Sequence, residues 1–222
     1  MDKEQAIIFD MDGVLIDNKK YHQEAWYEFS KRHQRPTTNA DFQLIGFGKT
    51  NKEYLEHVLD RDVSDAEADQ LGEEKEQLYR TIISQHLEPL KGLNAFLENL
   101  KTNAAFKLAV ATSAPPSNLD FVMDKLGIRS FFDALVNSSY VSNGKPDPEI
   151  FLKAAELLKV NPKRCIVFED SFFGIEAAHK AGMKVIGVAT NHAHEELKDC
   201  ETSINNFTEI SLNTIHQILN KD

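Results

Sequence analysis

Near its start the chain reads Ala6-Ile7-Ile8-Phe9-Asp10-Met11-Asp12-Gly13, and the fold class can be argued from this stretch. A short apolar run that ends in a polar loop is typical of a buried strand in a parallel sheet. Later apolar runs of the same kind predict further strands at 107–112, 135–137, 165–168 and 185–188. Helical patterns at 117–126, 148–158 and 171–181 separate them. This alternation predicts an α/β fold with a doubly wound, Rossmann-like parallel sheet.

Residues 18–89 break the alternation. They contain amphipathic helical patterns at 21–33, 51–59 and 66–86, and no strand pattern lies between these segments. A glycine-containing loop around Lys49 interrupts them, and the segment 89–92 supplies a second hinge. We therefore predict an α-helical domain at 18–89, inserted into an α/β core formed by residues 1–17 and 90–222.

Composition narrows the class of protein. Of the 222 residues, 41% are hydrophobic and 27% are charged, which is typical of a soluble globular protein. The formal charge of -10, without a basic cluster, argues against nucleic acid as a partner. No apolar stretch reaches membrane-spanning length or resembles a signal sequence. The two cysteines lack the spacing of a disulfide framework, which is typical of a reducing compartment, so we expect a cytoplasmic protein. We also expect no membrane partner, and we expect a monomer.

Polar side chains follow several of the predicted strands. Asp10 and Asp12 follow the first, Thr112 and Ser113 the second, and Glu169 and Asp170 the fourth. The carboxyl ends of parallel strands lie along one edge of the sheet, where ligands bind in open α/β folds. The sequence thus predicts four carboxylates and two hydroxyl groups at a common site.

A divalent cation gives these carboxylates a physical reason to be together, because like charges repel one another when they are desolvated. An oxygen-only set without His or Cys favours Mg²⁺. The alternative is that the acids cap the helices that follow them. Capping suits one or two of the acids, but it does not account for all four.

Lys145 lies in the stretch Gly144-Lys145-Pro146-Asp147-Pro148, where the prolines stiffen the backbone. A lysine in a loop is usually solvated. Beside a carboxylate cluster, a fixed ammonium group would screen the acids and bind a phosphate oxygen.

The chain resembles the haloacid dehalogenase superfamily along its whole length. The resemblance rests on four motifs in order, Asp10-Met11-Asp12-Gly13-Val14, Thr112-Ser113, Gly144-Lys145-Pro146 and Glu169-Asp170-Ser171. The inserted helices resemble the small α-helical cap of the β-phosphoglucomutase-like branch. Four motifs in the family's order are far more specific than an isolated Asp-x-Asp.

The resemblance implies a role for each motif residue. Asp10 would attack phosphorus and form an aspartyl phosphate, with Asp12 as the general acid and base. Mg²⁺ would be held by the Asp10 carboxylate, the Asp12 carbonyl oxygen, Asp170 and Glu169, the last directly or through water. Thr112, Lys145 and the backbone near Ser113 would hold phosphoryl oxygens. Since dehalogenases of the superfamily lack the second aspartate, Asp12 favours phosphoryl transfer.

The cap residues that resemble substrate-binding positions of the branch are His22, Lys49 and Lys75. Lys49 stands where β-phosphoglucomutases use an arginine to bind the second phosphate. A lysine supplies the charge but cannot form the two parallel hydrogen bonds of a guanidinium group. Both His22 and Lys75 also occur in related phosphatases. Their alternatives are a hydrogen-bonded histidine on the first cap helix and a lysine on a solvated helix face.

We therefore predict a Mg²⁺-dependent phosphatase for a small phosphorylated metabolite such as a sugar phosphate. The alternative is a β-phosphoglucomutase. Two more remote alternatives are a phosphonoacetaldehyde hydrolase, which would need alanine in place of Asp12, and a metabolite-binding protein without catalysis. The loop 191–194 follows the last predicted strand and could border the site, but we interpret it as solvent-exposed.

Overall fold

The computed structural model describes residues 4–37, 51–103 and 106–221. The chain forms two compact units, one made of Met1–Asp17 with Glu88–Asp222 and the other of Asn18–Leu87. Each unit is described by itself below. Lys49 and its loop lie outside the described residues.

The larger unit is built on a parallel sheet with the strand order β3-β2-β1-β4-β5-β6. The strands are β1 (Gln5–Phe9), β2 (Phe106–Ala111), β3 (Ala134–Val136), β4 (Cys165–Glu169), β5 (Lys184–Val188) and β6 (Thr202–Ile204). The predicted doubly wound fold with a helical insertion is confirmed. Strand β6 was not predicted, because its three residues, Thr-Ser-Ile, carry little apolar signal.

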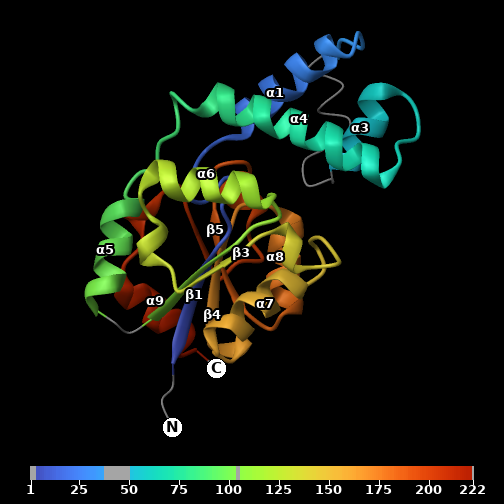
Figure 1. The fold of residues 1–222 in the computed structure, drawn as a ribbon. Helices are drawn as coiled ribbons and strands as arrows, with labels where there is room; N and C mark the ends of the chain where they lie inside the picture. Colours follow the sequence, from blue (N-terminus) through green and yellow to red (C-terminus); the bar gives the residue numbers. More distant parts are fainter. Residues whose placement is uncertain (1–3, 38–50, 104–105, 222) are drawn as a thin grey trace. The chain divides into compact units, whose positions relative to one another are not determined.

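Helices cover both faces of this sheet (Figure 1). They are α5 (Leu93–Asn103), α6 (Pro116–Leu126), α7 (Glu149–Leu158), α8 (Phe172–Lys180) and α9 (Leu212–Leu219). On one face Ile8 and its neighbours pack with the apolar sides of α7 and α8. On the other, Phe9 stacks on Phe168 at 5.1 Å between ring centroids and meets Phe96 of α5 at 6.4 Å. Both faces of β1 are buried, which is why its sequence is apolar throughout.

The smaller unit contains the helices α1 (Lys19–Arg32), α3 (Asn51–Leu59) and α4 (Asp65–Ile83). Its core is an aromatic and aliphatic cluster that includes Trp26, Phe29, Tyr54 and Leu55. The Ser64 hydroxyl accepts a hydrogen bond from the Glu67 N–H at 3.3 Å and so caps the start of α4. The three predicted helical segments of the insertion are present in the described residues.

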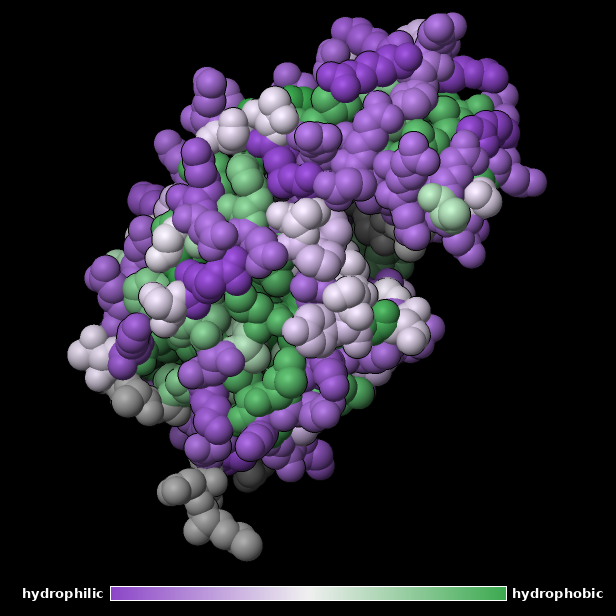
Figure 2. Space-filling view, viewed as in Figure 1, coloured by the Kyte–Doolittle hydropathy of each residue, from purple (hydrophilic) through white to green (hydrophobic). Residues whose placement is uncertain are grey.

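Most of the face seen in Figure 2 is hydrophilic, with hydrophobic residues in small groups between the polar ones. This agrees with a sequence in which 27% of the residues are charged. Within the described ranges, no helix combines the length and the apolar character needed to cross a membrane.

Candidate active site

The candidate site lies where the winding of the sheet changes direction. The chain runs from β1 to β2 on one side, whereas β4 pairs with β1 on the other side. In open α/β sheets this switch point opens a crevice at the carboxyl ends of the strands. Asp10 directly follows β1, and Glu169 and Asp170 stand at the end of β4.

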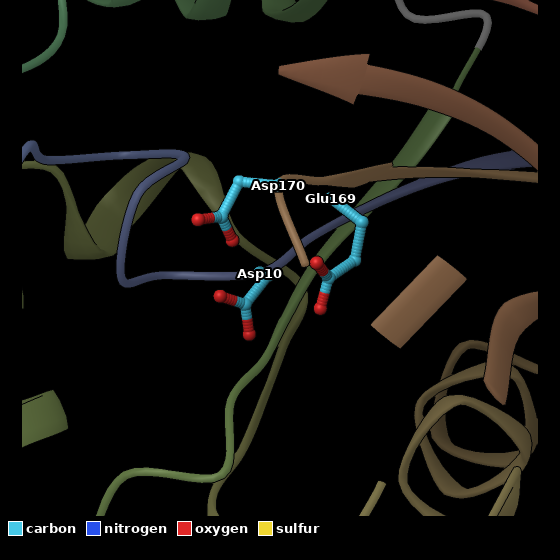
Figure 3. Close-up of side chains that lie close together, drawn as sticks. All are labelled: Asp10, Glu169 and Asp170. Carbon is cyan, nitrogen blue, oxygen red and sulfur yellow. The ribbon is translucent and has the colours of Figure 1, made fainter. Parts of the chain in front are cut away.

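Three carboxylates converge at this point (Figure 3). Asp10, Glu169 and Asp170 each offer an oxygen atom, and these atoms lie within 4.8 Å of one another. All three residues are buried, with exposures of 6%, 1% and 4%. A buried set of carboxylate oxygens without nitrogen or sulfur has the donor chemistry that Mg²⁺ prefers.

Burial makes this cluster costly to ionise. It raises the pKa of Asp10 to about 7, although the neighbouring Lys145 ammonium opposes the shift. Burial also raises the pKa of Asp170 well above its usual range, and the charges of Glu169 and Asp10 add to this effect. A divalent cation beside these groups would favour their charged forms and so oppose the rise in their pKa values.

Lys145 is fixed between two of the acids. Its Nζ lies 2.7 Å from Oδ1 of Asp10 and 2.6 Å from Oε1 of Glu169. Burial alone would lower the pKa of Lys145, but the two carboxylates raise it above its ordinary value. The turn that carries the lysine is closed by a hydrogen bond from the Asp147 N–H to the Gly144 carbonyl, at 3.0 Å. The Lys145 side chain is therefore charged and only 9% exposed, so the solvated alternative is wrong.

Glu169 is oriented by the start of α8. Its Oε2 accepts hydrogen bonds from the Ser171 N–H at 2.6 Å and the Ser171 hydroxyl at 3.0 Å. The same hydroxyl caps α8 by accepting from the Gly174 N–H at 3.1 Å. A Cβ atom on Gly174 would lie 1.6 Å from Oε1 of Glu169. Position 174 therefore needs a glycine to leave room for the carboxylate.

Asp10 sits at the start of a tight loop. Its N–H continues the ladder by donating to the Phe168 carbonyl at 3.0 Å, and the Met11 carbonyl accepts from the Leu15 N–H at 2.9 Å. Gly13 has a φ of +78°, and a Cβ there would lie 2.2 Å from Oδ2 of Asp170. The loop thus brings the backbone of Gly13 against the carboxylate of Asp170, which directly follows β4. Asp12, in the same loop, is half-buried.

Thr112 and Ser113 follow β2, next to β1 in the sheet. Thr112 is buried, and its hydroxyl accepts a hydrogen bond from the Ala114 N–H at 3.1 Å. Ser113 is exposed. Because Phe9 pairs with Val110, Asp10 and Thr112 continue from neighbouring strands at the same edge.

The two described cap candidates are in contact within the smaller unit. Nζ of Lys75 lies 2.9 Å from Nδ1 of His22 and 2.9 Å from Oε1 of Glu76. Lys75 is only 2% exposed, so its interpretation as a lysine on a solvated helix face is wrong. The His22 ring stacks on Tyr79 with centroids 3.8 Å apart. Burial and the Lys75 charge lower the pKa of His22 to about 3.

Two residues of these clusters were not predicted. Asn191 donates a hydrogen bond from Nδ2 to Oδ2 of Asp170. It lies after β5 in the loop 191–194, so for Asn191 the alternative that this loop borders the site is correct and the solvent-exposed interpretation is wrong. Glu76 is 3% exposed and pairs with Lys75, and the sequence of α4 contains no signal that separates it from the solvated acids nearby.

A family model described as haloacid dehalogenase-like hydrolase matches residues 4–182. Among curated proteins, the chain is 34% identical over 186 residues to the phosphorylated carbohydrates phosphatase of Thermotoga maritima, covering 82% of this chain and 83% of that protein. It is 31% identical over 221 residues to the β-phosphoglucomutase of Bacillus subtilis, covering 96% and 94%. It is also 30% identical over 216 residues to the chloroplastic 5-amino-6-(5-phospho-D-ribitylamino)uracil phosphatase of Arabidopsis thaliana. That match covers 97% of this chain but 58% of the plant protein.

Solved structures show the same similarity. A family IA, variant 3 hydrolase of this class from Entamoeba histolytica superposes with a TM-score of 0.92 at 33% identity, covering 98% of this chain and all of that one (100%). The β-phosphoglucomutase of Clostridium difficile superposes with a TM-score of 0.82 at 29% identity, covering 98% and 97%.

Proposed function

Because the chain belongs to the haloacid dehalogenase-like hydrolases, in their β-phosphoglucomutase-like branch, we propose that it is a Mg²⁺-dependent phosphatase of a small phosphorylated metabolite. The observation that carries the proposal is the buried cluster of Asp10, Glu169 and Asp170 with Lys145 fixed beside it. A cluster that needs a cation, next to a fixed ammonium group, suits a dianionic phosphate ester.

The donor set fits Mg²⁺. Asp10, Glu169 and Asp170 would hold the ion, with the carbonyl oxygen of Asp12 as a further ligand. The ion would stabilise negative charge on the phosphoryl oxygens. Lys145, Thr112 and the backbone near Ser113 would bind the same oxygens.

Asp10 is proposed as the nucleophile and Asp12 as the proton carrier. A carboxylate oxygen of Asp10 forms a bond to phosphorus while the bond from phosphorus to the ester oxygen breaks, and Asp12 gives that oxygen its proton. Asp12 then takes a proton from the water that attacks the aspartyl phosphate. The Asp10 carboxylate and inorganic phosphate are released.

We assign substrate selection to residues 18–89 as a cap and the chemistry to residues 1–17 and 90–222. A sugar phosphate is the proposed substrate, since one relative is named a phosphorylated carbohydrates phosphatase and another a fructose-1-phosphate phosphatase. Within the cap, His22, Lys75 and Lys49 are the proposed substrate residues. Of these, His22 and Lys75 form the hydrogen-bonded pair described above.

The test is phosphate release from a panel of sugar and polyol phosphates, with and without Mg²⁺. We expect turnover that requires Mg²⁺ and is lost in Asp10→Asn, which keeps the side-chain shape but removes the nucleophilic charge. Thermal unfolding of the variant checks that it is folded. Turnover that persists in folded Asp10→Asn would reject Asp10 as the nucleophile.

The second candidate is a β-phosphoglucomutase. It is favoured by the match to the Bacillus subtilis mutase over nearly the whole chain. This function predicts isomerisation of β-glucose 1-phosphate, stimulated by catalytic amounts of the bisphosphate. Phosphate release without isomerisation in the same assay would exclude the mutase and support the phosphatase.

A further inference from the structure

Only one of the two polar atoms of the Asn191 side chain has a hydrogen-bond partner within the described residues. Its Nδ2 donates to Oδ2 of Asp170, whereas its Oδ1 is buried and has no hydrogen-bond partner in that part of the chain. This orientation follows from chemistry, because a carboxylate accepts hydrogen bonds and only the NH₂ group of the amide can donate one. A buried acceptor without a hydrogen bond is unfavourable, so Oδ1 requires a donor.

The backbone holds Asn191 in this place. The hydroxyl of the preceding Thr190 donates to the carbonyl of Gly13 at 2.6 Å and ties the segment after β5 to the loop after β1. A Cβ on Gly13 would lie 2.9 Å from Nδ2 of Asn191 and 2.2 Å from Oδ2 of Asp170. The missing side chain of Gly13 therefore lets the amide reach the carboxylate.

We propose that Asn191 is a positioning residue for the metal ion, an inference that rests on the Mg²⁺ of the proposed function. Its Nδ2 fixes the carboxylate of Asp170, and its Oδ1 accepts a hydrogen bond from a water molecule bound to the ion. Protein-bound Mg²⁺ keeps several of its waters, and these waters are hydrogen-bond donors. Oδ1 belongs to the same amide group as Nδ2, so it lies close to the proposed ligand Asp170.

A fixed Asp170 has a consequence for metal selectivity. Mg²⁺ requires a nearly ideal octahedral arrangement, whereas Ca²⁺ accepts variable geometry and more ligands. Asn191 thus favours Mg²⁺ over Ca²⁺, because it restricts one ligand and one water together. Partners of this kind around a metal site contribute 10- to 100-fold in affinity.

The experiment measures the dissociation constants of Mg²⁺ and Ca²⁺ by isothermal titration calorimetry on the full chain, without substrate. Asn191→Leu has a similar volume but lacks both polar atoms. We expect it to weaken Mg²⁺ binding about tenfold and Ca²⁺ binding no more than about threefold. A second variant, Asn191→Ser, keeps the loop polar with a side chain too short for both contacts, and we expect it to lose the same selectivity.

His194→Ala is the matched control. It removes the 2.7 Å hydrogen bond between His194 and Ser203 in the same connection and should leave both affinities unchanged. Equal loss of both affinities in the Asn191 variants, or no loss, overturns the positioning role while the Mg²⁺ of the wild type stands. Absence of Mg²⁺ binding in the wild type overturns both this inference and the metal of the proposed function.

Discussion

Lys75 of α4 donates a hydrogen bond to Nδ1 of His22 on α1, with 2.9 Å between the two nitrogen atoms. Lysine carries only donors, so Nδ1 accepts and the proton of the neutral imidazole lies on Nε2. The contact therefore determines which tautomer of His22 is available to a ligand.

The His22 contact predicts that the smaller unit loses stability in acid. The pKa of His22 is about 3 in the folded protein, against an ordinary value of 6.5. As the pH falls from 6.5 to 3, the unfolded state binds a proton that the folded state rejects, so stability decreases by at most about 1.4 kcal/mol per pH unit. Urea unfolding can be followed by the fluorescence of Trp26, the one tryptophan of the chain.

His22→Asn is the matching variant, since its amide oxygen can replace Nδ1 as an acceptor but does not titrate. We expect the free energy of unfolding of the variant to depend less on pH in this window. Equal slopes for both proteins would show that His22 does not titrate on unfolding.

Breaking the buried pair of Lys75 and Glu76 should destabilise the smaller unit. Nζ of Lys75 is 2.9 Å from Oε1 of Glu76, and both side chains are almost fully buried. Lys75→Met or Glu76→Gln leaves a buried charge without its partner, which lowers the free energy of unfolding by about 3 kcal/mol. The double variant should lose less than the sum of the single losses.

The exposed ion pair of Lys180 and Glu176 is the comparison for the variants at positions 75 and 76. Glu176→Gln should change the free energy of unfolding by less than about 1 kcal/mol, because water screens an exposed pair. Additive losses in the double variant at 75 and 76 would contradict a direct coupling.

Mg²⁺ should stabilise the larger unit against heat. The ion relieves repulsion among Asp10, Glu169 and Asp170, and at about 100 times its Kd it adds about 2.7 kcal/mol to the free energy of unfolding. Differential scanning fluorimetry with MgCl₂ or with chelator measures the shift in Tm. Asp170→Asn should reduce the shift, and NaCl at equal ionic strength should not reproduce it. A shift of equal size in Asp170→Asn would place the ion elsewhere.

Gly174→Ala should impair the metal site through Glu169. The added Cβ would overlap Oε1 of that residue, so the carboxylate must turn away. We expect Mg²⁺ binding, measured by calorimetry, to weaken at least about tenfold.

Gly182→Ala is the control for a glycine variant that only loses stability. Gly182 has a φ of +76° but no heavy atom within 4 Å of an added Cβ. It should lower Tm through backbone strain and leave Mg²⁺ affinity unchanged. An unaltered Mg²⁺ affinity in Gly174→Ala would mean that Glu169 adapts to the added methyl group.

Strands with apolar residues on both faces could be predicted well. Phe9 and Ile8 are buried on opposite sides of β1, so the run is apolar without alternation. By contrast, α5, β6 and α9 were not predicted. Strand β6 has three residues, two of them polar, and α9 is a short helix of eight residues, so neither presents the long pattern on which such predictions depend.

The meeting of Asp10, Glu169 and Asp170 could be predicted from the order of the apolar runs, because a parallel sheet brings the carboxyl ends of its strands to one edge. The contacts of Asn191 with Asp170 and of Lys75 with His22 are visible only in the folded chain. Strand ends follow from local apolar patterns. The partner of a polar side chain depends instead on packing between segments far apart in the chain, here 21 residues for Asn191 and Asp170 and 53 for Lys75 and His22.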